Sequence, residues 1–471
     1  MPRIIVLGGG VSGLAAALLL SRDGHDVTVL EADAAPVPSS PASAWEDWPR
    51  DGVAQFRQTH SLTSRGHELL AAALPDVHAG LDAAGGVRLD VLDLMPPPIT
   101  DRTRREGDDR FVTVNARRPV LEHVLGRVAE AEPGLAIRRG TAVTELVMRA
   151  YDGVPHVAGV RTAAGEELDA DLVVDATGRR SRMPRWLQDA GAGPVHEEAE
   201  DSGFLYYTRY FRSDGRGVPP FRGPILTPIG TFSVLTVPAD NDTWSVTLYG
   251  SAGDQPLKRL RDPDRWTAVL AACPQHAQWL DGEPITGVEA MGGIVDRYRR
   301  LNLAATGVAL LGDAWACTNP SLGRGMTLGL LHAIRLHETV GEHLEDPRGF
   351  AEAWDAITEQ ELTPWYRDTV EEDRDRLREI VALRDGDRYA PPAGSNDAVR
   401  RALGAAAMRD PDAFRAYAST RSCLRLQREV CSDDAFLVRV LELAGAGGPP
   451  PLMGPDRERL LGLLAGDLAT A

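Results

Sequence analysis

Two glycine-rich segments contain the residue types that bind phosphate and hydroxyl groups. The first, at the N-terminus, has the pattern Gly8-x-Gly10-x-x-Gly13. The second, residues 307–329, reads GVALLGDAWACTNPSLGRGMTLG and places Asp313 in a glycine-rich loop before an apolar helix. Glycines let a phosphate approach the backbone, and a carboxylate accepts hydrogen bonds from sugar hydroxyls. The two segments therefore predict a site for a ligand with polar groups at two separate points.

The N-terminal motif lies between two predicted β-strands and opens a predicted helix. Gly8 allows the tight turn, Gly10 lets a pyrophosphate approach, and Gly13 lets helix and strand pack closely. The helix N-terminus offers free N–H groups to the phosphates. Glu31 ends the second strand, where such sites carry the acid that binds a ribose hydroxyl. The predicted dinucleotide-site residues are Gly8, Gly10, Val11, Ser12, Gly13 and Glu31.

Together the two segments fit one long cofactor with a nucleotide at one end and a ring system at the other, which we interpret as FAD. From residue 1 to about 340 the chain resembles the group A flavoprotein monooxygenases, which share the fold of p-hydroxybenzoate hydroxylase. Two further segments carry this resemblance. They are a helix start of the form Arg118-x-x-Leu-x-x-x-Leu and a strand that ends in an Asp-Ala-Thr-Gly turn at 175–178.

The resemblance implies that Arg118 reaches the flavin phosphates or ribitol, and that the 175–178 turn lies against FAD and helps to organise NAD(P)H. It also implies that Asp313 bonds the ribityl hydroxyls. The helix that begins near Gly325 would direct its N–H groups at the ring, where reduced flavin is anionic. The family often has Asn where this chain has Thr327. The further implied cofactor residues are Arg118, Val143, Asp175, Ala176, Thr177, Gly178, Gly312, Asp313, Pro320, Gly323, Gly325 and Met326.

One segment indicates a subfamily. Residues 50–60, RDGVAQFRQTH, resemble the R-x-G-V-P-Q-x-R-H-x-H segment of bacterial polyether epoxidases, which are related to squalene epoxidases. Ala54 stands in place of the proline and Gln58 in place of a histidine. The likeness implies that Arg57 and His60 lie near the flavin and act in catalysis, and a role in packing the loop is the alternative.

The resemblance implies a monooxygenase. FAD reduced by NADPH or NADH would react with O2 at C4a, and the hydroperoxide would transfer one oxygen in an epoxidation or a hydroxylation. A separate flavin reductase is an open alternative, because no second Gly-x-Gly-x-x-Gly motif is present for the reductant. An apolar, polyketide- or terpenoid-like substrate is expected. Two other classes stay open: an FAD-dependent reductase of the geranylgeranyl-reductase type, although its Y-x-W-x-F-P segment is absent, and a non-catalytic FAD-fold escort protein.

Composition argues against several other functions. The 471 residues carry 68 acidic and 51 basic side chains, a net charge of −17, which disfavours a nucleic-acid or anionic membrane surface. Four widely spaced cysteines indicate neither a disulfide framework nor a metal site, and they fit a reducing cytoplasm. No apolar run approaches the ~18 residues that a transmembrane helix needs.

An α/β framework is needed to position these residues. We expect a Rossmann-type FAD-binding domain over residues 1–200 together with 287–340. An antiparallel-sheet substrate domain over 201–286 would interleave with it, and a helical C-terminal region would cover 341–471. The alternating, aromatic-rich strands of the middle region predict that sheet. Its aromatic side chains and one tryptophan near Asp313 are candidates for the substrate pocket: Tyr207, Trp244, Tyr249 and Trp315.

Overall fold

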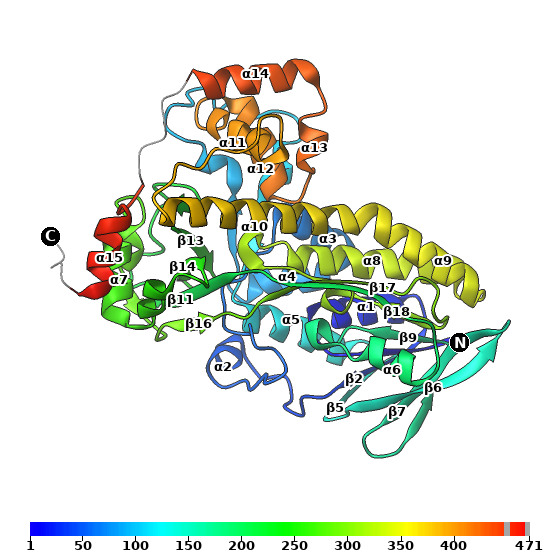
Figure 1. Cartoon of the computed structure of the whole chain (residues 1–471). Coiled ribbons are helices and arrows are strands. Elements are labelled where there is room, and N and C mark those ends of the chain that lie inside the picture. The colour runs from blue at the N-terminus through cyan, green and yellow to red at the C-terminus, as the bar shows by residue number, and fades with distance from the viewer. Residues whose placement is uncertain (447–452, 467–471) are drawn as a thin grey trace.

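The computed structural model describes residues 1–446 and 453–466 (Figure 1). Its central element is a parallel sheet with the strand order β18-β9-β1-β2-β5. In that order the strands span Val308–Leu310, Leu172–Asp175, Arg3–Leu7, Asp26–Glu31 and Leu135–Arg139. The inner strands are almost continuously apolar because both faces of the sheet are covered.

Helices cover one face of the parallel sheet. They are α1 (Val11–Arg22), α3 (Ser64–Ala73), α4 (Pro75–Ala83), α5 (Arg118–Ala131) and α8 (Gly325–His343). Small residues 15–17 of α1 are fully buried, which lets α1 and α8 lie close together. The other face is covered by β6 (Val143–Tyr151), β7 (Val154–Thr162), β8 (Glu167–Asp169) and α6 (Met183–Asp189).

A second, antiparallel sheet has the order β12-β13-β14-β11-β15, with β16 also paired to β11. The strands span Leu226–Ile229, Phe232–Ala239, Thr243–Ser251, Phe204–Arg212, Glu283–Pro284 and Glu289–Met291. One face packs against α7 (Pro263–Ala271) and α15 (Arg457–Ala465). A small sheet of β10 (His196–Asp201), β17 (Val295–Arg300) and β19 (Ala316–Cys317) leads back to the parallel sheet.

The C-terminal region is helical and contacts both the domain of the parallel sheet and the domain of the antiparallel sheet. In Figure 1, α9 (Pro347–Ile357) and α10 (Thr363–Arg384) run along the molecule, and α11 (Asn396–Ala406), α12 (Pro411–Arg421), α13 (Gln427–Val430) and α14 (Asp434–Gly445) lie above α10. Arg376 of α10 donates to the carbonyls of Gly230 and Phe232, both at 2.9 Å. In α15, Arg457 pairs with Asp254 of the sheet domain. The remaining elements include α2 (Pro41–Glu46), β3 (Val87–Asp90) and β4 (Val112–Asn115).

These layers confirm the predicted fold class: an α/β cofactor-binding domain, an interleaved antiparallel sheet and C-terminal helices. The residue limits given above for the three domains stay a prediction. No helix within residues 1–446 and 453–466 is both long and apolar enough to cross a bilayer. All four cysteines have free thiols.

Candidate cofactor and substrate site

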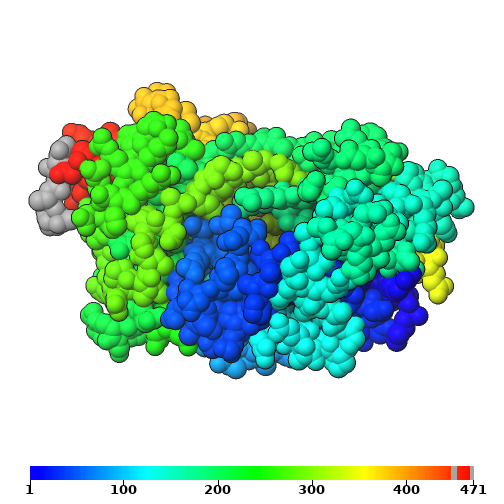
Figure 2. Space-filling view, turned by 90° about the horizontal axis from the view of Figure 1, so that it is seen from below, coloured from blue at the N-terminus to red at the C-terminus, as the bar shows by residue number. Residues whose placement is uncertain are grey.

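A cavity of about 430 Å³ lies where the carboxyl ends of β1, β2 and β9 meet the loop before α8. In Figure 2 the surface is hollowed between the blue N-terminal segments and the green segments of the middle of the chain. The volume is in the usual range for a small-molecule site. Most of the predicted cofactor residues border this cavity: Gly8, Gly10, Val11, Ser12, Glu31, Arg118, Val143, Ala176, Thr177, Gly178, Gly312, Asp313, Pro320, Gly323, Gly325 and Met326.

The glycines of the N-terminal motif have different surroundings. Gly8 has φ +100°, and a Cβ there would lie 2.6 Å from the carbonyl oxygen of Ala176. A Cβ on Gly13 would lie 2.1 Å from the carbonyl oxygen of Gly8, so Gly13 serves close packing and does not border the cavity. A Cβ on Gly10 would meet nothing within 4 Å. The space above Gly10 is thus open at the start of α1, where a pyrophosphate fits.

Glu31 is held rigidly at the end of β2. Its Oε2 accepts the Gly9 N–H at 2.8 Å and its Oε1 accepts the Asp33 N–H at 2.8 Å. The buried guanidinium of Arg50 lies 3.3 Å from the same carboxylate and 3.2 Å from that of Asp33. This carboxylate borders the cavity at its nucleotide end. This carboxylate fits a ribose hydroxyl, because its oriented oxygens accept hydrogen bonds from such groups.

Arg118 and His60 contact each other at the cavity wall. The Nη1 of Arg118 donates to Nε2 of His60 at 3.1 Å, while Nδ1–H of His60 donates to the Gln58 carbonyl at 2.8 Å. Burial, together with the charge of Arg118, lowers the pKa of His60 to about 3. The imidazole is therefore neutral, and its two nitrogens are both engaged. Arg117 points elsewhere and pairs with Asp240, so only Arg118 of the two is available to the cavity.

Asp175 lies beneath the turn that follows β9 and not in the cavity. It accepts the Thr177 N–H at 2.9 Å, the Thr177 hydroxyl at 2.6 Å, and the Ser181 hydroxyl. Burial raises its pKa, and these hydrogen bonds oppose the shift. Asp175 thus holds the turn in shape, which corrects the expectation that this side chain contacts the cofactor directly. The backbone of Ala176, Thr177 and Gly178 does border the cavity.

Asp313 lies near two arginines at the other end of the cavity. Burial raises the pKa of Asp313, and the positive charges of Arg118 and Arg179 oppose the shift. The adjoining Gly312 N–H donates to Nδ1 of His332 in α8 at 3.2 Å. His332 is not among the residues predicted from the sequence, where its only signal is its position two helical turns after Gly325.

The loop before α8 is open toward the cavity. A Cβ on Gly323 or on Gly325 would meet nothing within 4 Å, so both leave room at the helix N-terminus. Thr327, which stands where the family has Asn, is fully buried and faces away from this space. Its hydroxyl lies 2.9 Å from that of Thr63 and accepts the Thr63 N–H at 3.3 Å. Thr327 therefore ties α8 to α3 and offers no contact to a ligand.

Three of the four aromatic substrate-pocket candidates, which lie on β11 and β14, do not border the cavity. Tyr207 and Trp244 point into the core against α7 and α15, and Trp244 donates its Nε1–H to the Trp279 carbonyl at 2.9 Å. Tyr249 is on the other face but stacks on Tyr206 with ring centres 4.8 Å apart and does not border the cavity. Of the four aromatic candidates, Trp315 borders it.

The face of β11 that points toward the site contacts the 50–60 loop. Tyr210 donates its hydroxyl to the Gln58 carbonyl at 2.9 Å, and Thr208 donates to the Gln58 side chain at 2.9 Å. Gln58 borders the cavity, and so does Gln55. Sequence reasoning missed both glutamines as site residues, although Gln55 matches the glutamine of the epoxidase-like segment.

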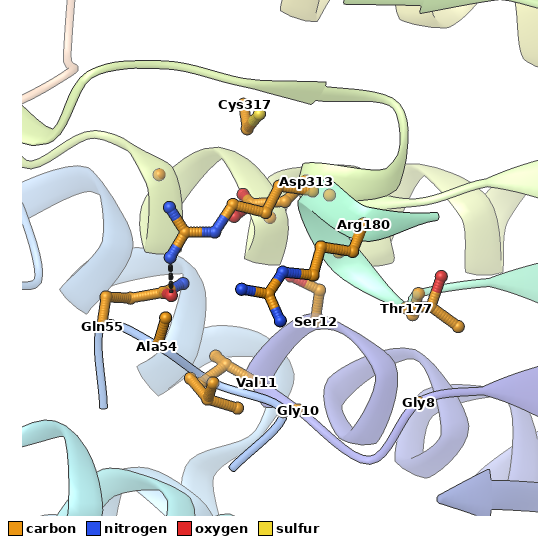
Figure 3. A pocket seen from close by; sticks show the side chains of 18 of the residues that line it. Gly8, Gly10, Val11, Ser12, Ala54, Gln55, Thr177, Arg180, Asp313 and Cys317 are labelled. Atoms are coloured by element: carbon orange, nitrogen blue, oxygen red, sulfur yellow. Dashed lines mark hydrogen bonds between the residues drawn. The ribbon is translucent and has the colours of Figure 1, made fainter. Parts of the chain in front are cut away.

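Arg57 is exposed and lies outside the cavity, contrary to the expectation of a place near the flavin. Its Nη2 donates to the Glu46 carbonyl at 2.9 Å and its guanidinium lies 5.8 Å from the Trp45 ring centre. It therefore packs the loop onto α2. The neighbouring Gln55 instead points toward the cavity, where Arg179 donates to its side-chain oxygen (Figure 3).

Most of the chain is similar in sequence to known proteins. The family described as FAD binding domain matches residues 2–352. "Protein Rv3254" of Mycobacterium tuberculosis is 28% identical over 363 residues, which are 71% of this chain and 72% of that protein. "Menaquinone reductase" of Mycolicibacterium smegmatis is 24% identical over 356 residues, which are 69% of this chain and 73% of that protein.

The fold also matches a solved structure. The crystal structure of PqsL from Pseudomonas aeruginosa, described as a probable FAD-dependent monooxygenase, superposes with a TM-score of 0.60 and 17% sequence identity. The match covers 82% of this chain and 99% of that chain. At this level of identity the likeness shows a shared fold.

Proposed function

We propose that this chain, which belongs to the FAD binding domain family and is an FAD-dependent oxidoreductase, is a monooxygenase that inserts one oxygen atom of O2 into a small apolar molecule. One observation carries the proposal. A single cavity joins the open N-terminus of α1 at Gly10 to Asp313 and the open N-terminus of α8 at Gly325. The chemistry of both ends fits one FAD molecule.

In this proposal each end of the cavity holds a different part of FAD. The start of α1 would bind the pyrophosphate, and Glu31 would bind the adenosine ribose. Arg118 and Asp313 would bind the ribityl chain and phosphate, and the N-terminus of α8 at Gly325 would stabilise negative charge on the reduced ring. Bound FAD would supply the two-electron redox chemistry with O2. The protein excludes water and fixes the geometry around it.

The remaining wall of the cavity suits an apolar substrate. Met291, Ile294 and Val295 border it from the end of β16, the loop that follows and the start of β17, and Trp315 adds an aromatic surface. This lining supports a polyketide- or terpenoid-like molecule and either epoxidation or hydroxylation. We assign NADPH or NADH as the reductant, with a separate flavin reductase as the alternative supplier of electrons.

A reductase is the second candidate function, and one observation favours it. The menaquinone reductase of Mycolicibacterium smegmatis aligns over 69% of this chain. In such a reaction the reduced cofactor would pass its electrons to a substrate double bond or quinone, and no oxygen atom would enter the product.

Isotopically labelled O2 distinguishes the two functions. FAD-loaded protein would be supplied with NADPH and, in turn, with apolar polyenes, phenols and a menaquinone, and the products analysed by mass spectrometry. A monooxygenase yields a product that gains one labelled oxygen atom. The Asp313→Ala protein should form less of this product when FAD is supplied at low concentration. A reduced product without the label, formed with the same consumption of NADPH, would contradict the proposal and favour the reductase.

A further inference from the structure

The loop that leads into α8 has one face toward the cavity and one face away from it. Thr318, Pro320 and Gly323 border the cavity. Asn319 and Ser321 do not border it and are buried. The groups that hold this buried face therefore determine the shape of the cavity wall at the start of α8.

Two buried carboxyl groups hold the loop from behind. Oδ1 of Asp296, in β17, accepts the backbone N–H of Asn319 at 2.6 Å. Oδ1 of Asp373, in α10, accepts the Ser321 hydroxyl at 2.6 Å. The Tyr206 hydroxyl of β11 donates to the side-chain oxygen of Asn319 at 2.7 Å. Three elements far apart in the sequence thus meet at this loop.

Neither carboxyl group has a positively charged partner. Within residues 1–446 and 453–466, no basic side chain forms an ion pair with Asp296 or Asp373, and Oδ2 of Asp373 has no hydrogen-bond partner. The neighbouring Glu372 and Arg374 of α10 form ion pairs with other residues. Two unpaired negative charges at one buried loop are costly, so one of the two carboxyl groups should keep its proton.

The surroundings of the two carboxyl groups oppose ionisation. Burial raises the pKa of Asp296 to about 6 and that of Asp373 to about 8, and the charge of Asp296 adds to the shift of Asp373. The hydrogen bonds from Asn319 and Ser321 act in the opposite direction. At neutral pH the pair therefore holds one proton.

Other titratable or charged groups face this pair from every element packed against it. The two arginines among them are in ion pairs with other carboxylates. The groups are Glu200 and Asp201 of β10, Tyr206 of β11, Tyr249 of β14, and Tyr366, Glu372, Arg374 and Arg376 of α10.

We propose that Asp373 and Asp296 position the loop before α8 by holding one proton between them, so that α10 controls the cavity wall at the flavin-ring end. Both are positioning residues, because they act through the loop and do not border the cavity. Asp373 lies beyond residues 2–352, which match the FAD binding domain family, so this control comes from the C-terminal helices. The inference rests on the proposed function, which places the flavin ring at this loop.

Loss of the proton would leave two unpaired negative charges behind the loop. Their repulsion and their need for water would disfavour the loop arrangement that binds FAD. FAD is itself an anion, so its binding favours the protonated pair. Affinity for FAD is therefore full below about pH 8 and falls as the pH rises above that value, because binding then requires the uptake of a proton.

Titration of the apoprotein with FAD at pH 7, 8 and 9 tests the proposal, with flavin fluorescence as the readout. We expect the Kd of wild type to rise about 3-fold or more between pH 7 and pH 9. Asp373→Asn keeps a neutral side chain of the same shape, so it should bind FAD as wild type does at pH 7 and lose the pH dependence. Asp387 is exposed just past the end of α10, and Asp387→Asn should keep the wild-type dependence.

Ser321→Ala provides a second variant. The Ser321 hydroxyl stabilises the ionised form of Asp373, so its removal should shift the midpoint of the pH dependence to higher pH. Circular dichroism at pH 7 checks that each variant is folded.

A wild-type Kd that stays constant from pH 7 to pH 9, or a dependence that survives in folded Asp373→Asn, would overturn the inference. If Asp373→Asn does not fold, an unshifted midpoint in Ser321→Ala would overturn it. Failure of the proposed function gives a different result: wild type then binds FAD with this pH dependence but forms no product that contains labelled oxygen.

Discussion

The carboxylate of Asp313 is the side chain on which the ring end of the site depends. Burial raises the pKa of this carboxylate, and the positive charges of Arg118 and Arg179 oppose the shift. We expect Asp313→Ala to weaken FAD binding by about 10- to 100-fold, because a charge-assisted hydrogen bond contributes about 1.5–3 kcal/mol. Titration of apoprotein with FAD, followed by flavin fluorescence, measures the change.

The exposed Asp51 provides a matched control for that variant. Asp51→Ala removes the same charge from the 50–60 loop outside the cavity wall and should leave FAD affinity unchanged. Equal FAD affinity of Asp313→Ala and wild type would refute the role given to Asp313.

His60 makes the stability of the protein depend on pH. Its pKa in the folded protein is about 3, whereas the unfolded imidazole takes up a proton near pH 6.5. Only the unfolded state gains this proton as the pH falls below about 6.5, so acid destabilises the fold. Between pH 7 and pH 5 the unfolding free energy of wild type should fall by about 2 kcal/mol more than that of His60→Gln.

Urea unfolding at the two pH values measures this difference. Equal losses in wild type and His60→Gln would show that His60 carries a proton in the folded protein. A charged His60 would also conflict with its acceptance of a hydrogen bond from Arg118.

Site residues that act through a short sequence motif were predictable from the sequence. Site residues that act through contacts with other segments of the chain were not. Gly8, Gly10 and Asp313 act through backbone conformation and chemical type, which a short motif reveals. Gln58 acquires its role from Tyr210, 152 residues along the chain, and His332 from Gly312 in the loop before its own helix. A single sequence does not show such pairings.

Two glycine-to-alanine substitutions test the roles of the turn between β1 and α1. Gly10 has negative φ and open space above it, so Gly10→Ala should fold normally but weaken FAD binding by about 10-fold or more, since the new methyl group occupies the phosphate position. Gly8→Ala should instead lower the unfolding free energy by about 1–2 kcal/mol or more, because of its positive φ and its contact with Ala176.

Thermal unfolding and FAD titration of both variants separate the two effects. A Gly10→Ala protein that binds FAD as tightly as wild type would place the pyrophosphate elsewhere. A fully stable Gly8→Ala protein would contradict the tight turn.

The two faces of β11 offer another matched pair. Tyr210 donates its hydroxyl to the Gln58 carbonyl, and Tyr210→Phe should cost about 1 kcal/mol of unfolding free energy because the carbonyl loses a partner. The buried Tyr207 hydroxyl has no partner among the described residues, so Tyr207→Phe should be neutral or stabilising. Urea unfolding of the two variants measures this, and equal losses would contradict the assignment of faces.

The sequence alone predicted this sheet but not which of its faces meets the site. Alternation assigns Tyr206, Thr208 and Tyr210 to one face and Tyr207 and Phe211 to the other. Both faces are buried, the first by the loop and the C-terminal helices and the second by α7 and α15. Hydrophobicity therefore does not distinguish the two faces. The prediction selected large aromatic side chains, and two of these, Tyr207 and Trp244, lie on the core face.

Across the whole molecule, the parallel sheet and its helices were predictable because each element has a strong local pattern. The return of α15 to the antiparallel sheet was not, because its apolar packing and its pair of Arg457 with Asp254 join residues some two hundred positions apart. The same long-range packing brings α10 across that sheet, where Arg376 binds the carbonyls of Gly230 and Phe232.

The flavin content of the purified protein tests whether the cavity holds FAD. We expect flavin absorbance in the isolated protein, or apoprotein that takes up one FAD per chain on titration, with reduced affinity in Gly10→Ala and Asp313→Ala. Folded wild-type protein that shows no flavin absorbance and binds no added FAD would contradict it.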